Sequence, residues 1–283
     1  MALNDGRGEH AGADGTDGTE VSDGVARPVA AFRGAVGFTT RLPVGHRESD
    51  WAAFRATPVA LPLAGYLVGA LLALPFVLLP PVGVPPAVVS AAFLAWVYLL
   101  TGINHVDGLA DLGDAAVVHG DQERRLAVLK DTTVGVGALL AVGLVLAALA
   151  LAGLSLAGVP AAAPSPLSVV GIVVAAEVGA KLGMVVVAAF GTAATDGLGA
   201  ELSGRIDAAS LAVPAAVALP AAAVAWPSPA GVAALLAPVL VALGLWRWAR
   251  ANLGGVNGDV MGAANELGRL AALLVGVVAW THW

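Results

Sequence analysis

The segment that decides the fold is TGINHVDGLADLGDAAVVHGDQERRLAVLKDTTVG, residues 101–135. It holds five Asp, two Arg and one Lys, whereas the chain has no Asp, Glu, Lys or Arg at 56–100 before it or at 136–176 after it. A polar segment between two long apolar stretches is typical of a membrane protein in which spanning helices are joined at the membrane surface. The rest of the chain is arranged around this connection.

The composition excludes a soluble globular protein. The chain has 283 residues, of which 58% are hydrophobic and 12% charged, and its mean hydropathy is +0.85. Three windows without charged residues, 56–106, 132–176 and 208–246, are each long enough for about two spanning helices of about 20 residues. Prolines near the middle of each window favour a turn there. The windows therefore predict three transmembrane hairpins.

The predicted fold is an all-α, polytopic integral membrane helical bundle with about seven transmembrane helices and short cytoplasmic and interfacial helices. The expected spans are 59–79, 87–104, 134–158, 168–190, 208–226, 231–248 and a last apolar run that ends at Trp283. Residues 1–26 have too little apolar surface to fold, so we expect a disordered acidic tail. Residues 27–283 then form one membrane-embedded catalytic domain that begins with an interfacial helix at 27–44.

Basic residues predict the orientation of the protein. The hairpin turns carry none, and the other connections hold Arg41, Arg47, Arg55, Arg124, Arg125, Lys130, Arg205, Arg247 and Arg250. Because basic residues mark the cytoplasmic side, we expect a multi-pass protein of the cell membrane with a cytoplasmic N-terminus and an active site that faces the cytoplasm. The chain has no cysteine, which excludes disulfide and thiolate chemistry.

Three carboxylates in the central segment predict a metal site. If the chain is helical from Asp107 onward, Asp107, Asp111 and Asp114 are spaced i, i+4 and i+7 and lie within one narrow arc. Three clustered anions repel one another unless a cation lies between them. Oxygen ligands suit a hard divalent ion, and Mg²⁺ typically takes one or two carboxylates and completes its shell with water and phosphate. We therefore expect Mg²⁺ as the cofactor.

Other polar residues of this region each have two interpretations. His105 is either a general base or an interfacial hydrogen-bonding residue. Arg41 either anchors the chain at the lipid headgroups or binds phosphate. Arg124, Arg125 and Lys130 either mark the cytoplasmic side or neutralise a diphosphate. The acids Asp121 and Glu123, in contrast, are expected only to cap and begin a short helix.

The C-terminal segment GGVNGDVMGAANELGR, residues 254–269, is the second polar cluster. Its glycines allow close approach to a phosphate, and a helix N-terminus attracts anions. Asp259 is either the N-cap of the last helix or a metal ligand. Glu266 lies near or within the bilayer and needs a partner such as Arg269 or a bound group. Glu177 and Lys181, spaced i, i+4 inside a span, are first a structural ion pair and second a substrate contact.

Five segments together resemble the cobalamin synthase family, adenosylcobinamide-GDP ribazoletransferase. They are FTTRLPV at 38–44, NHVDGLADLGDA at 104–115, RRLAVLKDTTVGVGA at 124–138, AAFGTAATDGLGAEL at 188–202 and GGVNGDVMGAANEL at 254–267. The resemblance extends from about Phe32 to the C-terminus. It implies a Mg²⁺-dependent membrane enzyme that binds adenosylcobinamide-GDP and α-ribazole or its phosphate, joins them late in vitamin B12 assembly, and releases GMP.

The resemblance also assigns roles to particular residues. It carries over Asp107, Asp111, Asp114, Lys130, Asp131, Asn257, Gly258 and Asp259. With the residue patterns, it gives His105, Asp107, Asp111 and Asp131 as catalytic; Asp107, Asp111, Asp114 and Asp259 as metal ligands; and Arg41, Arg124, Arg125, Lys130, Asn257 and Gly258 as substrate-binding.

The sequence patterns leave two other functions open. The DGLAD sequence partly resembles the acidic motif of CDP-alcohol phosphotransferases, although the Ala-Arg expected there is absent because Asp111 follows Ala110. A transporter would place polar residues near the bilayer midplane in broken helices, and only Glu177 and Lys181 fit that description. We expect contact with the lipid bilayer and no nucleic-acid partner, and self-association stays open.

Overall fold

The computed structural model describes residues 19–45, 47–158, 167–203, 206–207 and 209–283. This part of the chain is helical and contains no strand, so the predicted all-α class is confirmed. The long helices are α3 (Ala60–Leu72) with its continuation α4 (Leu74–Leu78), α5 (Pro86–Thr101), α8 (Val136–Gly158), α9 (Leu167–Phe190), α11 (Ala212–Ala223), α12 (Ala230–Asn252) and α13 (Gly258–Thr281).

The predicted number of seven spans is not confirmed. In the described residues, five helices are long and apolar enough to cross a membrane, or six if α5 and the helix after it count as one bent span. The five are Ala60–Val82, Val136–Gly158, Ser168–Phe190, Ala230–Asn252 and Gly258–Thr281. The shortfall has a geometric cause. A rise of 1.5 Å per residue makes the 16 residues of α5 about 24 Å long and the 12 residues of α11 about 18 Å long, against a hydrocarbon core of about 30 Å.

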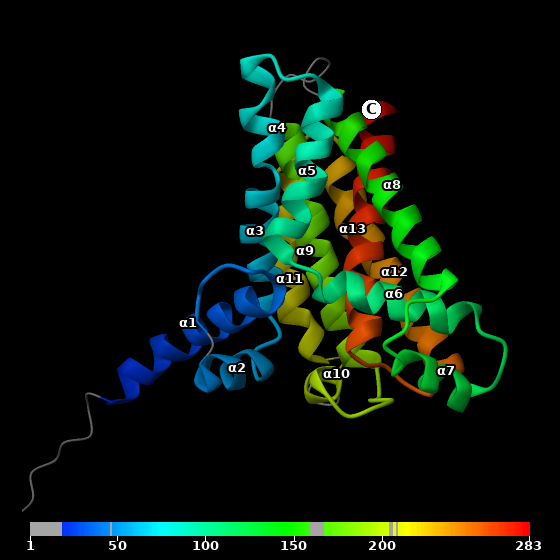
Figure 1. Cartoon of the computed structure of the whole chain (residues 1–283). Coiled ribbons are helices and arrows are strands. Elements are labelled where there is room, and N and C mark those ends of the chain that lie inside the picture. Colours follow the sequence, from blue (N-terminus) through cyan, green and yellow to red (C-terminus); the bar gives the residue numbers. More distant parts are fainter. Residues whose placement is uncertain (1–18, 46, 159–166, 204–205, 208) are drawn as a thin grey trace, which may run out of the picture.

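The centre of the bundle is α9, which packs against α3, α11, α12 and α13 (Figure 1). Its spanning window is 94% buried, whereas that of α8 is 28% buried, so α8 lies at the periphery. Gly69 of α3 allows the close approach to α9, because a Cβ atom there would lie 2.7 Å from the Cα of Val174. Small residues at helix contacts are the usual means of packing helices within a membrane.

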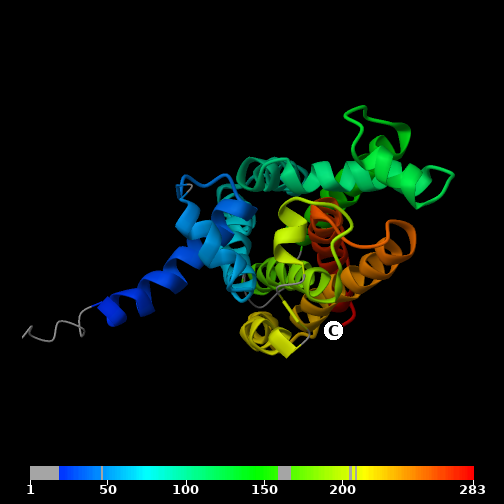
Figure 2. The same ribbon diagram turned by 90° about the horizontal axis from the view of Figure 1, so that it is seen from below.

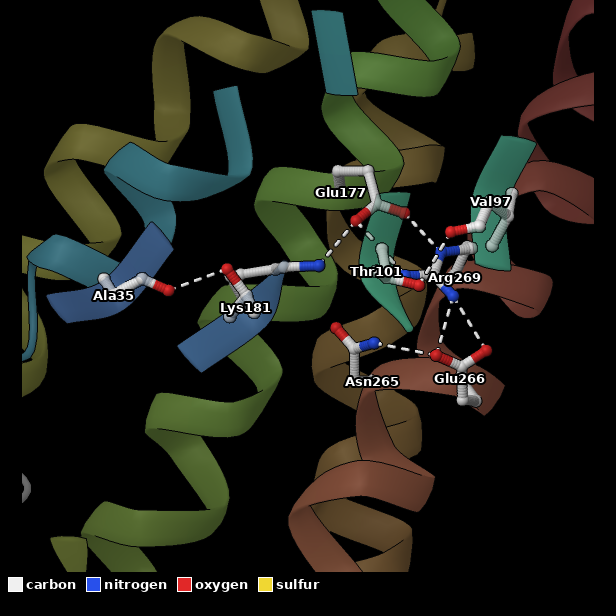
Figure 3. Close-up of polar contacts among 9 residues, drawn as sticks. Ala35, Val97, Thr101, Glu177, Lys181, Asn265, Glu266 and Arg269 are labelled. Carbon is white, nitrogen blue, oxygen red and sulfur yellow. Dashed lines mark hydrogen bonds and ion pairs between the residues drawn. The ribbon is translucent and has the colours of Figure 1, made fainter. Parts of the chain in front are cut away.

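Four charged side chains form a buried charge network in this core: Glu177 and Lys181 of α9, and Glu266 and Arg269 of α13 (Figure 3). Lys181 Nζ lies 2.6 Å from Glu177 Oε2, and Arg269 Nη1 lies 2.7 Å from Glu266 Oε1. Arg269 Nε also pairs with Glu177, which joins the two helices. Two cations and two anions balance, as the high cost of a bare charge in a membrane requires. The predicted partner for Glu266 is confirmed, and the Glu177–Lys181 ion pair forms.

The remaining α-helices lie together at one end of the bundle, opposite the C-terminus (Figure 1). They are α1 (Thr19–Thr39), α2 (Glu48–Arg55), α6 (Asn104–Val117), α7 (Gln122–Leu129) and α10 (Leu198–Leu202). Seen from that end, α1 and α2 lie on one side, α6 and α7 along another, and α10 between them (Figure 2). The tail boundary expected at residue 26 falls inside α1, and residues 1–18 of the expected tail lie outside the described chain.

Candidate active site

Helix α6 carries the first half of the candidate site. The chain leaves α5 at Gly102, whose φ of 73° is a conformation that glycine adopts without strain. The axis of α6 is bent by 98° from that of α5, so α6 runs across the end of the bundle and is not one of the five helices that qualify as spans on their own (Figure 1). Gly108 brings α6 against the start of α13, because a Cβ atom there would lie 2.7 Å from the Cα of Asp259. The two polar segments of the sequence therefore meet.

This contact creates the acid cluster, which we define as Asp107, Asp111 and Asp259. None of the three takes part in an ion pair within the described residues. Partial burial, followed by the negative charges of Asp259, Asp107 and Asp114, raises the pKa of Asp111 to about 6. The site thus holds an excess of negative charge that a bound cation would relieve.

Asp114 differs from the rest of the predicted metal set. One of its oxygens accepts the N–H of Gly135 at 2.7 Å and the other accepts the N–H of Ala138 at 2.9 Å. Asp114 therefore caps the beginning of α8 and ties it to α6. The helix that places Asp107, Asp111 and Asp114 on one arc forms as predicted, and Asp259 of α13 joins them. Both oxygens of Asp114 already accept backbone N–H groups, so it is the least available of the four predicted ligands.

The beginning of α13 is capped by Asn257 rather than by Asp259. Asn257 Oδ1 accepts the N–H of Val260 at 3.1 Å, and its Nδ2 donates to Asp259 Oδ2 at 2.7 Å. The N-cap interpretation of Asp259 is therefore wrong, and its carboxylate is turned to the acid cluster. Gly258 is exposed, and the loop before it is fixed by the hydrogen bond from the N–H of Val256 to the carbonyl of Thr192.

The basic residues lie at the two ends of α6. Arg41 is exposed at its N-terminal end, with its aliphatic carbons against Gly102. At its C-terminal end, Arg125 donates to the carbonyls of Ala115 and Ala116, so this guanidinium caps α6. Arg124 lies on α7 and Lys130 directly after it, and both side chains are exposed. Asp121 caps α7 by accepting the N–H of Arg124 at 3.0 Å, as predicted.

Asp131 makes only local contacts in the described structure. Its carboxylate accepts the N–H of Thr133 at 3.0 Å in the turn that precedes α8. Hydrogen bonds from the side chain and the backbone of Thr133 lower the pKa of Asp131. The structure therefore gives Asp131 a role in the turn and does not bring it into the acid cluster.

His105 is buried, 5% exposed, at the first turn of α6. Neither ring nitrogen has a hydrogen-bond partner in the described structure. Burial, followed by the positive charge of Lys181, lowers the pKa of His105 to about 4, so the ring is neutral at neutral pH. A neutral imidazole with a free nitrogen is able to accept a hydrogen bond from a substrate hydroxyl.

The acidic side chains of the site do not enclose a metal ion by themselves. No group of three or more His, Cys, Asp or Glu side chains in the described residues converges closely enough to enclose a metal. This argues against the closed sites typical of structural Zn²⁺ or Ca²⁺ and leaves an open arrangement. Mg²⁺ suits such an arrangement because it takes one or two carboxylates and obtains its other ligands from water and phosphate.

Sequence reasoning missed one element of the site, α2. This helix contributes Trp51, whose indole N–H donates to Glu201 Oε2 at 3.0 Å, and Arg55, which lies 2.6 Å from the same oxygen. These contacts tie α2 to α10 beside the beginning of α13. The alternation of charged and aromatic residues in ESDWAAFR was the available signal for a short amphipathic helix.

Comparison with known proteins identifies relatives over most of the chain. A family model described as cobalamin-5-phosphate synthase matches residues 31–277. The adenosylcobinamide-GDP ribazoletransferase of Halorubrum lacusprofundi is 48% identical over 260 residues, which cover 90% of this chain and 99% of the relative. Proteins of the same name from Haloquadratum walsbyi and Halobacterium salinarum are 45% and 49% identical, over 89% and 70% of this chain and 98% of each relative. No solved structure matches it. The chain thus belongs to the cobalamin-5-phosphate synthase family and is a transferase of phosphate-containing groups.

Proposed function

We propose that this chain transfers the adenosylcobinamide phosphate moiety from adenosylcobinamide-GDP to the ribose hydroxyl of α-ribazole or α-ribazole phosphate. The hydroxyl oxygen forms a bond to the cobinamide-linked phosphorus, the bond from that phosphorus to the GMP oxygen breaks, and GMP leaves. The hydroxyl proton passes to a base or to water. The observation that carries the proposal is the acid cluster, which has no cationic partner in the described chain and lies between exposed basic residues.

Asp107, Asp111 and Asp259 are the candidate ligands of Mg²⁺, and one or two of them would bind the ion directly because the three do not converge on one point. Asp114 would add negative potential from behind. When bound, the ion supplies charge neutralisation for the phosphate oxygens. The fit rests on the excess charge that raises the pKa of Asp111 and on the fact that all the candidate ligands are carboxylate oxygens. Both features suit an ion that shares its ligands between the protein and a diphosphate.

The other site residues bind and orient the substrates. Arg41 at one end of α6, and Arg124 and Lys130 near the other, neutralise the phosphate oxygens, with the fork of Arg suited to two oxygens at once. The exposed N-terminus of α13, at Gly258, adds N–H donors and a favourable dipole. His105 accepts a hydrogen bond from the attacking hydroxyl, and its low pKa makes it a better orienting group than a base.

The orientation of the site follows from the charges. The helices α2 and α7 and the end of α12, which carry basic residues, lie at the same end of the bundle as the acid cluster (Figure 1). By the positive-inside rule this end faces the cytoplasm, which contains the nucleotide substrate. We accordingly place the protein in the cell membrane with its N-terminus in the cytoplasm.

The test is release of GMP by purified protein supplied with Mg²⁺, adenosylcobinamide-GDP and α-ribazole. Loss of even an outer-shell partner of a bound metal typically costs 10–100-fold, so Asp111→Asn is expected to lower turnover at least about a hundredfold. Asp121→Asn is the matched control, because Asn caps a helix as well as Asp does. Transfer to a CDP-alcohol substrate instead, or full turnover by Asp111→Asn, would contradict the proposal.

A further inference from the structure

A cleft of about 480 Å³ opens beside the acid cluster, between α1, α2, α6, α10 and the beginning of α13. Its walls include Phe38, Trp51, His105, Asp259 and Met261. Asp259 belongs both to this cleft and to the acid cluster, so a molecule in the cleft lies next to the candidate metal site. The arrangement of helices around it is visible from the end of the bundle (Figure 2).

One wall of the cleft is aromatic and held in place. The ring centroids of Phe38 and Trp51 are 5.8 Å apart. Glu201 accepts the indole N–H of Trp51, and the guanidinium of Arg55 lies 5.7 Å from the centre of the same ring while also pairing with Glu201. An aromatic side chain fixed in this way is a stacking surface for a planar base.

The cleft also holds a polar group without a partner. His105 is 5% exposed, and both ring nitrogens lack a hydrogen bond within the described residues. Its ring meets that of Phe38 edge-on, with centroids 5.9 Å apart. A buried polar atom without a partner is costly, so this histidine favours a ligand that offers a hydrogen bond.

We propose that this cleft binds the acceptor, the benzimidazole nucleoside α-ribazole or its phosphate, and not the corrinoid donor. The inference rests on the proposed function. Its volume falls within the roughly 300–1,000 Å³ typical of sites for small ligands, which suits a nucleoside and not a corrin macrocycle carrying a nucleotide. The base lies against Phe38 and Trp51, and the ribose lies toward His105 and Asp259. The donor then approaches from the exposed face of α6.

Equilibrium dialysis of α-ribazole against the full-length protein in detergent, without donor, tests the proposal directly. One lost base–aromatic stacking contact is worth about tenfold in affinity, so Trp51→Leu and Phe38→Leu are each expected to raise the Kd by about that factor. Trp51→Phe keeps an aromatic face and is expected to stay within about threefold. Trp226→Leu is the matched control, because Trp226 is 80% exposed and lies outside the cleft.

Steady-state kinetics separate this inference from the proposed function. Trp51→Leu is expected to raise KM for α-ribazole and to leave KM for adenosylcobinamide-GDP within about twofold. Unchanged affinity for α-ribazole in Trp51→Leu and Phe38→Leu, or a change confined to KM for the donor, would overturn the acceptor site. Failure of the unaltered protein to release GMP would instead overturn the proposed function, whatever the dialysis shows.

Discussion

The acid cluster and the buried charge network are both groups of charged side chains, yet they differ in net charge. The buried charge network has two cations and two anions, all 1% exposed or less, and joins α9 to α13. The acid cluster lies at the end of the bundle and has three anions without a cationic partner among the described residues. Balanced charge inside a membrane protein holds helices together, whereas unbalanced charge at its surface marks a place for a ligand.

The largest effect is expected from the buried charge network. Arg269→Met leaves Glu177 and Glu266 buried without their shared partner, and breaking a buried ion pair typically lowers the free energy of unfolding by about 3–5 kcal/mol. Denaturation of the protein in detergent micelles measures this change. Replacing all four residues with Met is expected to recover most of the loss, because no charge is then left unpaired.

The same pair of variants tests whether the network is only structural. Normal turnover by the fourfold variant would show that the network holds the helices and does nothing else. If Arg269→Met instead leaves stability unchanged and lowers turnover, the network contacts substrate, which was the second interpretation of Glu177 and Lys181.

The acid cluster is expected to respond to pH in the opposite sense from an ordinary ion pair. The pKa of Asp111 is raised from its ordinary value of 3.8 to about 6 in the folded protein. Asp111 therefore stabilises the folded state fully below pH 3.8, and this stabilisation is lost as the pH rises through about 6. Metal-free protein should therefore have a higher Tm at pH 5 than at pH 7.5.

The affinity for Mg²⁺ is expected to rise with pH, whereas the stability of the metal-free protein falls. Protons compete with the metal for Asp111, so Mg²⁺ affinity should fall by about tenfold per pH unit below about 6. Titration calorimetry with MgCl₂ at several pH values measures this slope, and Asp111→Asn should remove it. A slope that is the same in Asp111→Asn would show that another group takes up the proton.

The smallest effect is expected at Asp114. Asp114→Ala removes the cap of α8, which typically costs about 1 kcal/mol of stability, and should lower turnover only a few-fold. Parallel measurement of Tm and GMP release in Asp114→Ala and Asp111→Ala compares the two positions. Equal loss of turnover in both variants would show that Asp114 is a metal ligand, as the spacing on α6 predicts.

Much of the fold could be predicted because the membrane imposes strong rules on sequence. The lengths of the charge-free windows and the prolines near their middles placed α5, α8, α9 and α12 within a few residues of their positions. Helix spacing also predicted the Glu177–Lys181 ion pair and the cap at Asp121. These features depend on residues that lie near one another in the chain.

The candidate site was less predictable because it depends on contacts between distant segments. Spacing alone grouped Asp114 with Asp107 and Asp111, but the unsatisfied N–H groups at the start of α8 engage its carboxylate. The cap of α13 at Asn257 was likewise decided by backbone geometry. The cleft walls formed by Phe38 and Trp51 require the packing of α1 and α2 beside α10.

By itself, the sequence determined a helical membrane protein with its polar segments at one end and the family to which it belongs, because hydropathy and local spacing act along the chain. Only the tertiary structure decided which carboxylates form the acid cluster and which aromatic side chains form the adjoining cleft. The physical reason is that these groups come from helices far apart in sequence, and the close contact of Gly108 with Asp259 is what brings the two acidic segments together.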